Sequence, residues 1–162
     1  MRASTHLRTR TRAVFAGVIA AGAIAVPVAV AGAPTQVSTA KNAKLGTILV
    51  NAHGGTLYVF TKDHGRSSCT GSCAKAWPPL LGGSVLAVHG VSAAKLKLTT
   101  RSDGNKQATY DGHPLYTFAG DRKAGQTNGQ GLSQFGGKWY VINVSGNQVT
   151  KSGDCNPVCT GY

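Results

Sequence analysis

Two aspartates, Asp63 and Asp121, are the only carboxylates in this chain whose positions suggest a pair. Each follows an aromatic residue by three positions, and the two are 58 residues apart. A glycosidase needs two carboxyl groups at a controlled separation, one of them with a raised pKa. All five acidic residues are Asp and none is Glu, so few carboxyl groups could serve as the acid and the base of a glycosidase. The zinc-protease, Gly-x-Ser-x-Gly, phosphate-loop and Rossmann motifs are also missing, and we expect a protein that is not an enzyme.

Four cysteines form two pairs with the same spacing, Cys69/Cys73 and Cys155/Cys159. In an oxidising compartment an even number of cysteines is typical of disulfides. A tight turn through Gly71 can bring residues four apart to the Cα separation that a disulfide needs. We therefore favour the local bridges 69–73 and 155–159. The alternative connects the tail to the first pair and closes a loop of about 80 residues.

The same sulfurs support a second hypothesis if they are thiolates. Cys69 and Cys73, with His64 nearby, have the ligand types for a soft metal such as copper in an extracytoplasmic metal or redox carrier. Covalent haem attachment is excluded because neither cysteine pair is followed by His. The thioether ligand of many copper carriers is missing, since the only methionine is Met1. The sequence therefore predicts no cofactor, with the metal site as the alternative.

The two aspartates belong to a duplicated segment. Its aromatic and acidic residues recur 58 positions later: Tyr58, Phe60 and Asp63 as Tyr116, Phe118 and Asp121. In a structural interpretation these aromatic residues build the core together with Trp77 and Trp139, and the aspartates begin turns. In a functional interpretation the tyrosines and aspartates of both copies converge across a pseudo-twofold into one polar cleft.

Each copy predicts a β-hairpin, because a strand-forming run (48–50 or 107–110) and a glycine turn precede Leu-Tyr-x-Phe. Alternation places Tyr58 and Phe60 on one face of the returning strand and Leu57 and Val59 on the other. Further strands are expected at 96–100 and 138–144, with 147–151 returning across a turn at 145–146. The best helical candidate is the short stretch 92–98. The fold class is therefore all-β or nearly so, in a single small domain of two pseudo-repeated hairpin units.

The chain begins with the features of a cleaved signal peptide, predicted over 1–31, with an uncleaved N-terminal anchor as the alternative. Four arginines precede an apolar run over 13–30, and Ala29 and Ala31 form an Ala-x-Ala site. Residues 32–44 are rich in Pro, Thr, Ser, Lys and Asn and predict a flexible lead-in. The two-repeat β domain follows over 45–151, with repeat one at about 46–81 and repeat two at about 104–144. A cysteine-containing tail occupies 152–162.

The chain is strongly basic, with 17 Lys and Arg against five Asp and a formal charge of +12. Removal of the leader with its four arginines leaves +8. Such an excess is typical either of a solubilising surface or of a protein in anionic surroundings. The expected partners are anionic cell-wall or envelope polymers. We expect no specific nucleic acid and no stable membrane insertion after cleavage.

The chain resembles a family of secreted repeats and predicted lipoproteins with a Tyr-x-aromatic-x-x-Asp motif. The motif stands here over 58–63 and 116–121, and the segments 69–80, 103–107 and 129–140 resemble the family's intervening sequences. The resemblance implies an exported, envelope-associated protein whose biochemical role is unassigned. Family members are often lipid-anchored, whereas this chain has no cysteine at the end of its leader. The sequence therefore predicts a secreted, non-catalytic binding or structural protein of the cell envelope.

Overall fold

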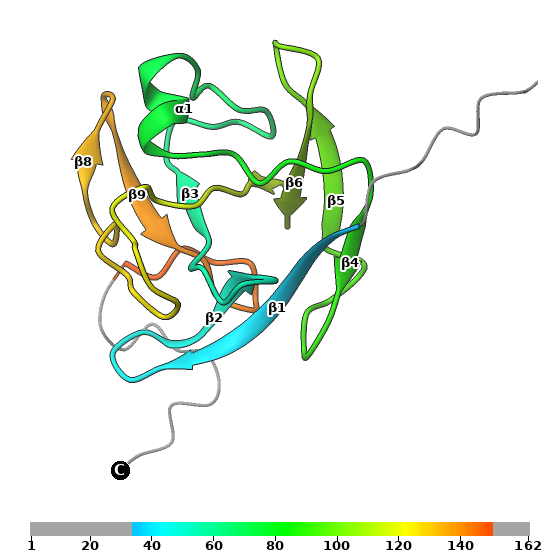
Figure 1. Ribbon diagram of the computed structural model, residues 1–162, viewed down its shortest axis with the longest axis vertical. Coiled ribbons are helices and arrows are strands. Elements are labelled where there is room, and N and C mark those ends of the chain that lie inside the picture. Colours follow the sequence, from blue (N-terminus) through cyan, green and yellow to red (C-terminus); the bar gives the residue numbers. More distant parts are fainter. Residues whose placement is uncertain (1–33, 151–162) are drawn as a thin grey trace, which may run out of the picture. The chain divides into compact units, whose positions relative to one another are not determined.

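The computed structural model describes residues 34–150, and nearly all regular structure in that range is β (Figure 1). The expected all-β, two-repeat fold class is confirmed. No helix within 34–150 is long and apolar enough to span a membrane. The predicted signal peptide over 1–31 and the tail with Cys155 and Cys159 lie outside the described residues.

The strands of the described region form three small sheets. The first has the order β2-β1-β4, the second β3-β9-β8 and the third β5-β6-β7. The strand bounds are β1 Thr35–Asn42, β2 Gly46–Asn51, β3 Tyr58–Phe60, β4 Val85–Ala87, β5 Leu96–Thr100, β6 Lys106–Tyr110, β7 His113–Pro114, β8 Ser133–Gln134 and β9 Gly137–Val141. A short helix, α1 (Ser72–Ala76), lies between β3 and β4 in the chain.

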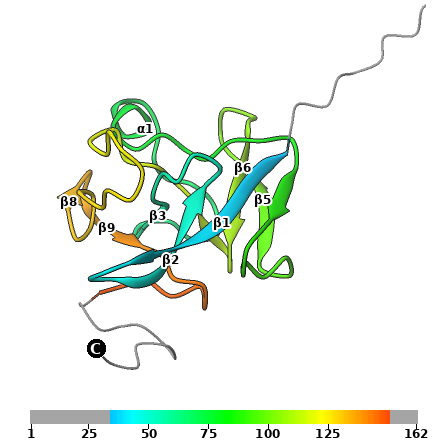
Figure 2. The same cartoon turned by 60° about the horizontal axis from the view of Figure 1, so that its bottom comes forward.

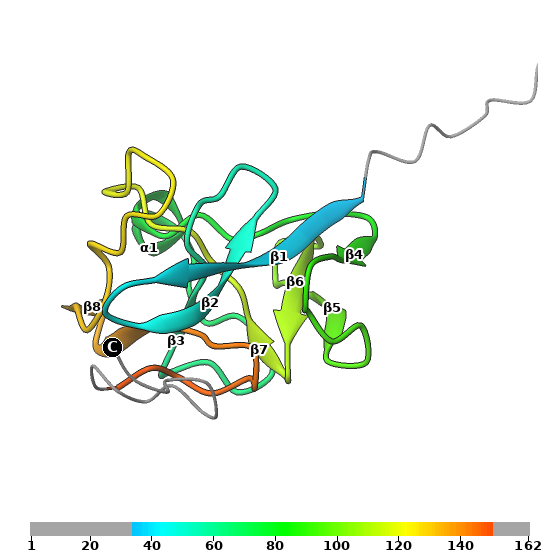
Figure 3. The same ribbon diagram turned by 90° about the horizontal axis from the view of Figure 1, so that it is seen from below.

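The lead-in predicted over 32–44 is wrong for Thr35–Asn42, which form β1. This strand pairs antiparallel with β2 from Val37 to Asn42 and parallel with β4 from Thr35 to Val37 (Figure 3). Val37 is fully buried. The polar composition that suggested a flexible segment belongs to the partly exposed face, while the pairing uses backbone groups that composition does not reveal.

Strand β3 is buried on both faces, as its apolar residues predict, although it stands at the end of its sheet. Its register with β9 runs from Tyr58↔Val141 to Phe60↔Trp139. On its other edge the Tyr58 N–H donates to the Tyr116 carbonyl at 2.8 Å, and the Tyr116 N–H returns a bond of 3.0 Å. Tyr58 and Phe60 join one core cluster, and Leu57 and Val59 join the other. The alternation therefore divides the core into two parts on either side of this strand.

The two predicted hairpins are present in unequal form. In the second repeat, β6 and β7 are joined by the tight turn Asp111–Gly112, with φ of 50° and 83°. In the first, β2 and β3 are linked by a longer connection, which is held to β2 by the bridge Val50↔Thr56 and by bonds from Asn51 N–H to the Gly55 carbonyl and from Leu57 N–H to the Leu49 carbonyl. The sequence therefore predicted the duplication better than the tightness of each turn.

The strand expected over 138–144 is present as β9 but ends at Val141, and the segment expected to return over 147–151 meets this part of the chain through the isolated bridge Ile142↔Gln148 and a bond from Val149 N–H to the Val141 carbonyl. Strand β5 has the predicted bounds and runs beside β6 (Figure 2). The helical candidate 92–98 is wrong, because Leu96 and Leu98 pair with β6 as part of β5. Pairing with β6 and burial of Leu96 outweigh the helix propensity of the preceding Ala93-Ala94-Lys95.

The burial of Val37 in β1 predicts that a charge at this position destabilises the fold. Val37→Asp introduces a carboxylate at a fully buried position and is expected to lower the free energy of unfolding by about 3 kcal/mol or more. The matched control is Gln36→Asp, since Gln36 is the exposed neighbour on the same strand. Urea unfolding followed by tryptophan fluorescence measures both. Equal stability of the two variants would contradict a structural role for β1.

Candidate functional site

The motif tyrosines and aspartates form two hydrogen-bonded pairs, and each pair joins one repeat to the other. The Tyr58 hydroxyl donates to Asp121 Oδ2 at 2.7 Å. The Tyr116 hydroxyl donates to Asp63 Oδ2 at 2.6 Å. Both tyrosine side chains are fully buried. The carboxylates thus have a partner already, and the structure brings the four residues together as two interior pairs.

Each aspartate also fixes the loop that follows it. Asp63 Oδ1 accepts bonds from the backbone N–H of Ser68 at 2.8 Å and from its hydroxyl at 2.7 Å. Asp121 Oδ1 accepts from the Asn128 N–H at 2.9 Å. A carboxylate three residues beyond the aromatic therefore binds a tyrosine with one oxygen and a loop with the other.

The motif phenylalanines and the two tryptophans form a continuous stack of four rings. Phe60 stacks on Trp139 with centroids 4.2 Å apart, Trp139 on Trp77 at 4.0 Å, and Trp77 on Phe118 at 4.3 Å. Each phenylalanine therefore stacks on the tryptophan of the other repeat. Parallel and edge-on aromatic contacts each add about 0.5–1.5 kcal/mol to the area that they bury.

The tyrosines complete this cluster by edge contacts within their own repeats. Tyr58 meets Trp77 at 5.3 Å and 78°, and Tyr116 meets Trp139 at 5.1 Å and 88°. The arrangement is a pseudo-twofold that differs in an edge contact of Tyr58 with Phe118 at 6.5 Å and in the indole nitrogens. Trp77 Nε1 donates to Gln134 Oε1 at 2.9 Å, whereas Trp139 Nε1 is buried with no hydrogen-bond partner among residues 34–150.

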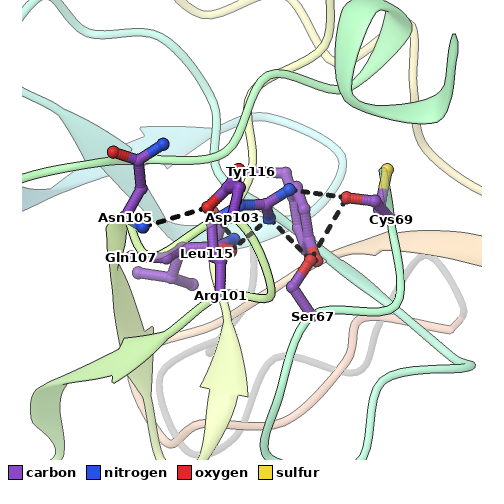
Figure 4. A network of polar contacts seen from close by, with 8 residues as sticks. All are labelled: Ser67, Cys69, Arg101, Asp103, Asn105, Gln107, Leu115 and Tyr116. Atoms are coloured by element: carbon purple, nitrogen blue, oxygen red, sulfur yellow. Dashed lines mark hydrogen bonds and ion pairs between the residues drawn. The ribbon is translucent and has the colours of Figure 1, made fainter. Parts of the chain in front are cut away.

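A buried arginine extends the Tyr116–Asp63 pair into a longer polar network (Figure 4). Arg101 is 5% exposed, and its Nη1 donates to Ser67 Oγ at 2.6 Å and to Gln107 Oε1 at 2.7 Å. Its Nη2 donates to the Cys69 carbonyl at 2.8 Å. The same Ser67 Oγ lies 2.7 Å from the Tyr116 hydroxyl. The network therefore runs from the Tyr116 pair to the backbone of the disulfide loop.

Sequence reasoning did not single out Arg101. A lone arginine beside a turn is usually a surface residue, and no repeated spacing marks this one. Its Nε lies 3.3 Å from Asp103 Oδ2, whose side chain is about half exposed. The hydrogen bond from the Asn105 backbone N–H is the main cause that lowers the pKa of Asp103. The hydrogen bond and positive charge of Arg101 lower this pKa further. The only local signal was the charged pair two residues apart at the end of β5.

Cys69 and Cys73 form a disulfide with a Cα–Cα distance of 5.2 Å, so the local pairing is confirmed and the crosslink from this pair to the tail is wrong. Both cysteines are buried, while His64 is exposed. The bridge removes both thiolates that the metal hypothesis requires. Within 34–150, no three His, Cys, Asp or Glu side chains are grouped as a metal site would need.

The two motif tyrosines hold their protons strongly. Burial raises the pKa of Tyr58 far above its ordinary value, and the hydrogen bond and negative charge of Asp121 raise it further. Burial, followed by the bond to Asp63, raises the pKa of Tyr116 in the same way. Each phenol is therefore a fixed donor to its aspartate through the neutral and mildly alkaline range.

The comparison with family models gives one match, described as a secreted repeat of unknown function, over residues 39–81 and 97–143. The first matched segment contains the first motif and Trp77, and the second contains the second motif and Trp139. Neither the curated proteins nor the solved structures gave a match. The two matched segments are thus the two halves that exchange partners in the core.

The exchange between repeats is testable by a double-mutant cycle. Tyr58→Phe and Asp121→Asn are expected to be coupled by about 1–3 kcal/mol, because the first removes the donor of one charge-assisted bond and the second removes the charge of its acceptor. Tyr58→Phe and Asp63→Asn serve as the matched cycle, and their effects are expected to add within about 0.5 kcal/mol. Chemical denaturation measures both cycles. Stronger coupling of Tyr58 to the aspartate of its own motif would contradict the crossed arrangement.

The raised tyrosine pKa values predict an alkaline loss of stability. The ordinary pKa of tyrosine is 10.0. Below that pH both the folded and the unfolded chain keep the tyrosine protons, so the full contribution of the two tyrosines to the free energy of unfolding is present. Above it the unfolded chain releases protons that the folded chain retains, so the unfolding free energy falls by about 1.4 kcal/mol per pH unit for each buried tyrosine.

Denaturation at a series of alkaline pH values measures that slope. Tyr58→Phe and Tyr116→Phe are each expected to reduce the slope of unfolding free energy against pH by the contribution of one tyrosine, about 1.4 kcal/mol per pH unit. An unchanged slope in both variants would show that neither phenol is responsible.

Proposed function

The chain belongs to the family described as a secreted repeat of unknown function, and from that premise we propose that it is a non-catalytic protein of the cell envelope that binds an anionic polymer there. Its extracytoplasmic location follows from the family. The binding role rests on how the structure distributes charge between the interior and the surface.

The acids of the described region are all engaged within the fold. Asp63 and Asp121 accept bonds from the buried tyrosines, while Asp103 and Asp111 pair with Arg101 and Lys95. The surface between residues 34 and 150 thus has little negative charge that is not already held by an internal partner.

The cations of the same region are mostly unpaired and exposed. Apart from Lys95 and Arg101, every Lys and Arg from 34 to 150 is exposed and forms no ion pair with a described carboxylate: Lys41, Lys44, Lys62, Arg66, Lys75, Lys97, Lys106, Arg122, Lys123 and Lys138. This one-sided surface is the observation that carries the proposal. A field of one sign attracts polymers of the opposite sign.

The motif geometry supports a role without catalysis. A general acid or nucleophile needs access to substrate, whereas each motif aspartate has one oxygen on a buried tyrosine and the other on its own loop. Cys69 and Cys73 are joined in a disulfide, so neither supplies a thiolate nucleophile. The motif carboxylates and the sulfurs of these two cysteines, which are the groups best suited to catalysis, are therefore used to hold the domain together.

Retention on isolated cell-wall material tests the proposal. The purified secreted protein is expected to bind at about 0.01 M ionic strength, where the Debye length is about 30 Å. It is expected to elute as the ionic strength is raised to about 0.15 M and higher, because the Debye length then falls to about 8 Å or less. A neutral polysaccharide matrix is the control and is expected not to retain it. Absence of retention on the anionic material at low salt would overturn the proposed function.

A further inference from the structure

The turn between β8 and β9 carries a phenylalanine in a conformation that costs stability. Gln134 pairs with Gly137, so Phe135 and Gly136 form a two-residue turn, and their φ angles are 55° and 77°. A turn with positive φ at both positions favours Asn-Gly or Gly-Gly. A bulky side chain in the left-handed region is an outlier.

Phe135 packs little against the core, so burial of its ring does not offset the strain in its backbone. It is 43% exposed and, within 34–150, one of three large exposed apolar side chains, the others being Leu81 and Leu86. A strained residue without a packing role points to a role at the surface.

The hairpin below the turn is firmly attached to the aromatic stack. Gln134 Oε1 accepts the Trp77 indole N–H at 2.9 Å, and the Lys138 N–H donates to Thr61 Oγ1 at 2.9 Å. Gly137 lies so close to Phe60 that an added Cβ would approach its ring to 2.6 Å. The exposed ring is therefore presented by a rigid support, which reduces the entropic cost of binding.

A lysine and a shallow hollow adjoin this turn, and a second lysine lines the hollow together with Phe135. Lys62 Nζ is 3.3 Å from the position of a Cβ on Gly136, and Lys138 follows the turn on β9. Both lysines are exposed and unpaired with any described carboxylate. A shallow hollow of about 380 Å³ is lined by residues 133–138, including the polar side chains of Ser133 and Gln134.

We infer that the turn Phe135–Gly136, with Lys62 and Lys138, is the contact site for a sugar ring of an anionic polysaccharide; the inference rests on the proposed function. The face of the Phe135 ring is electron-rich and attracts the C–H groups on the face of a sugar. The lysines attract a carboxylate on the same or the next sugar. A single ring beside a polar hollow suits a hydroxylated ring better than a lipid surface, which binds in proportion to buried apolar area.

Three soluble polymers separate the contributions of ring and charge. Polygalacturonate has a carboxylate on every sugar, polyglutamate has the charge without the ring, and dextran has the ring without the charge. Affinities of the purified secreted protein are measured by calorimetry or biolayer interferometry at low salt. The order expected is polygalacturonate, then polyglutamate, then dextran.

The key variant is Phe135→Asn, which removes the ring and places a turn-preferring residue in the left-handed position. It is expected to keep or raise the melting temperature while weakening polygalacturonate binding by about tenfold, with little change for polyglutamate. Leu86→Thr, which removes an exposed apolar side chain on β4, is the matched control and is expected to bind as the parent does.

A second comparison uses the lysines. Lys62→Gln with Lys138→Gln is expected to weaken polygalacturonate binding more than Lys41→Gln with Lys44→Gln, although both remove two exposed charges. Equal losses would assign the binding to overall charge and overturn the site.

The remaining outcomes distinguish the site from the proposed function. If polygalacturonate and polyglutamate bind equally and Phe135→Asn changes neither, the site is wrong and the binding of anionic polymers stands. If neither polymer nor cell-wall material is bound at low salt, the proposed function fails. Preferential binding of anionic lipid vesicles that depends on Phe135 would replace the sugar with a membrane surface. A lower melting temperature for Phe135→Asn would overturn the argument from strain.

Discussion

The structure depends on an exchange of partners between two copies of one short motif. The Tyr58 hydroxyl finds its acceptor on Asp121, and Phe60 finds its stacking surface on Trp139, both in the other half of the chain. A single repeat would leave a phenol without an acceptor and an indole face without a neighbour, at a cost that a segment of that size has little hydrophobic core to offset. The two copies therefore form one core and not two separate ones.

This exchange explains the spacing of the motif. Two residues at alternate positions of a strand share a face, so tyrosine and phenylalanine both reach the aromatic cluster. The chain then turns, and the aspartate N–H bonds to the phenylalanine carbonyl in both repeats, at 3.1 Å for Asp63 and 3.0 Å for Asp121. That turn leaves the carboxylate in reach of the other tyrosine. Each residue type is required by the core, and no ligand is needed to account for it.

The sequence predicted features whose signal is local. Alternation identified both faces of β3, and the glycine turn expected before each Leu-Tyr-x-Phe contains a glycine of positive φ, Gly54 in the first repeat and Gly112 in the second. Crossed pairing was not predictable, since an offset of 58 fits pairs within a repeat as well as between repeats. Strand β1 was missed because its pairing uses backbone groups, and Arg101 because its burial depends on acceptors far away in the sequence, such as Ser67.

The same constraint indicates where the two repeats are free to differ. With the motif residues fixed by the core, the two repeats differ most in the segment between aspartate and tryptophan. In the first repeat that segment carries the Cys69–Cys73 bridge and α1, and in the second it carries β8 and the turn at Phe135. Connecting segments on a rigid support are where binding residues concentrate. Within residues 34–150 the second of these loops combines an exposed ring with unpaired lysines, and it is therefore the loop to which we assign the proposed sugar contact.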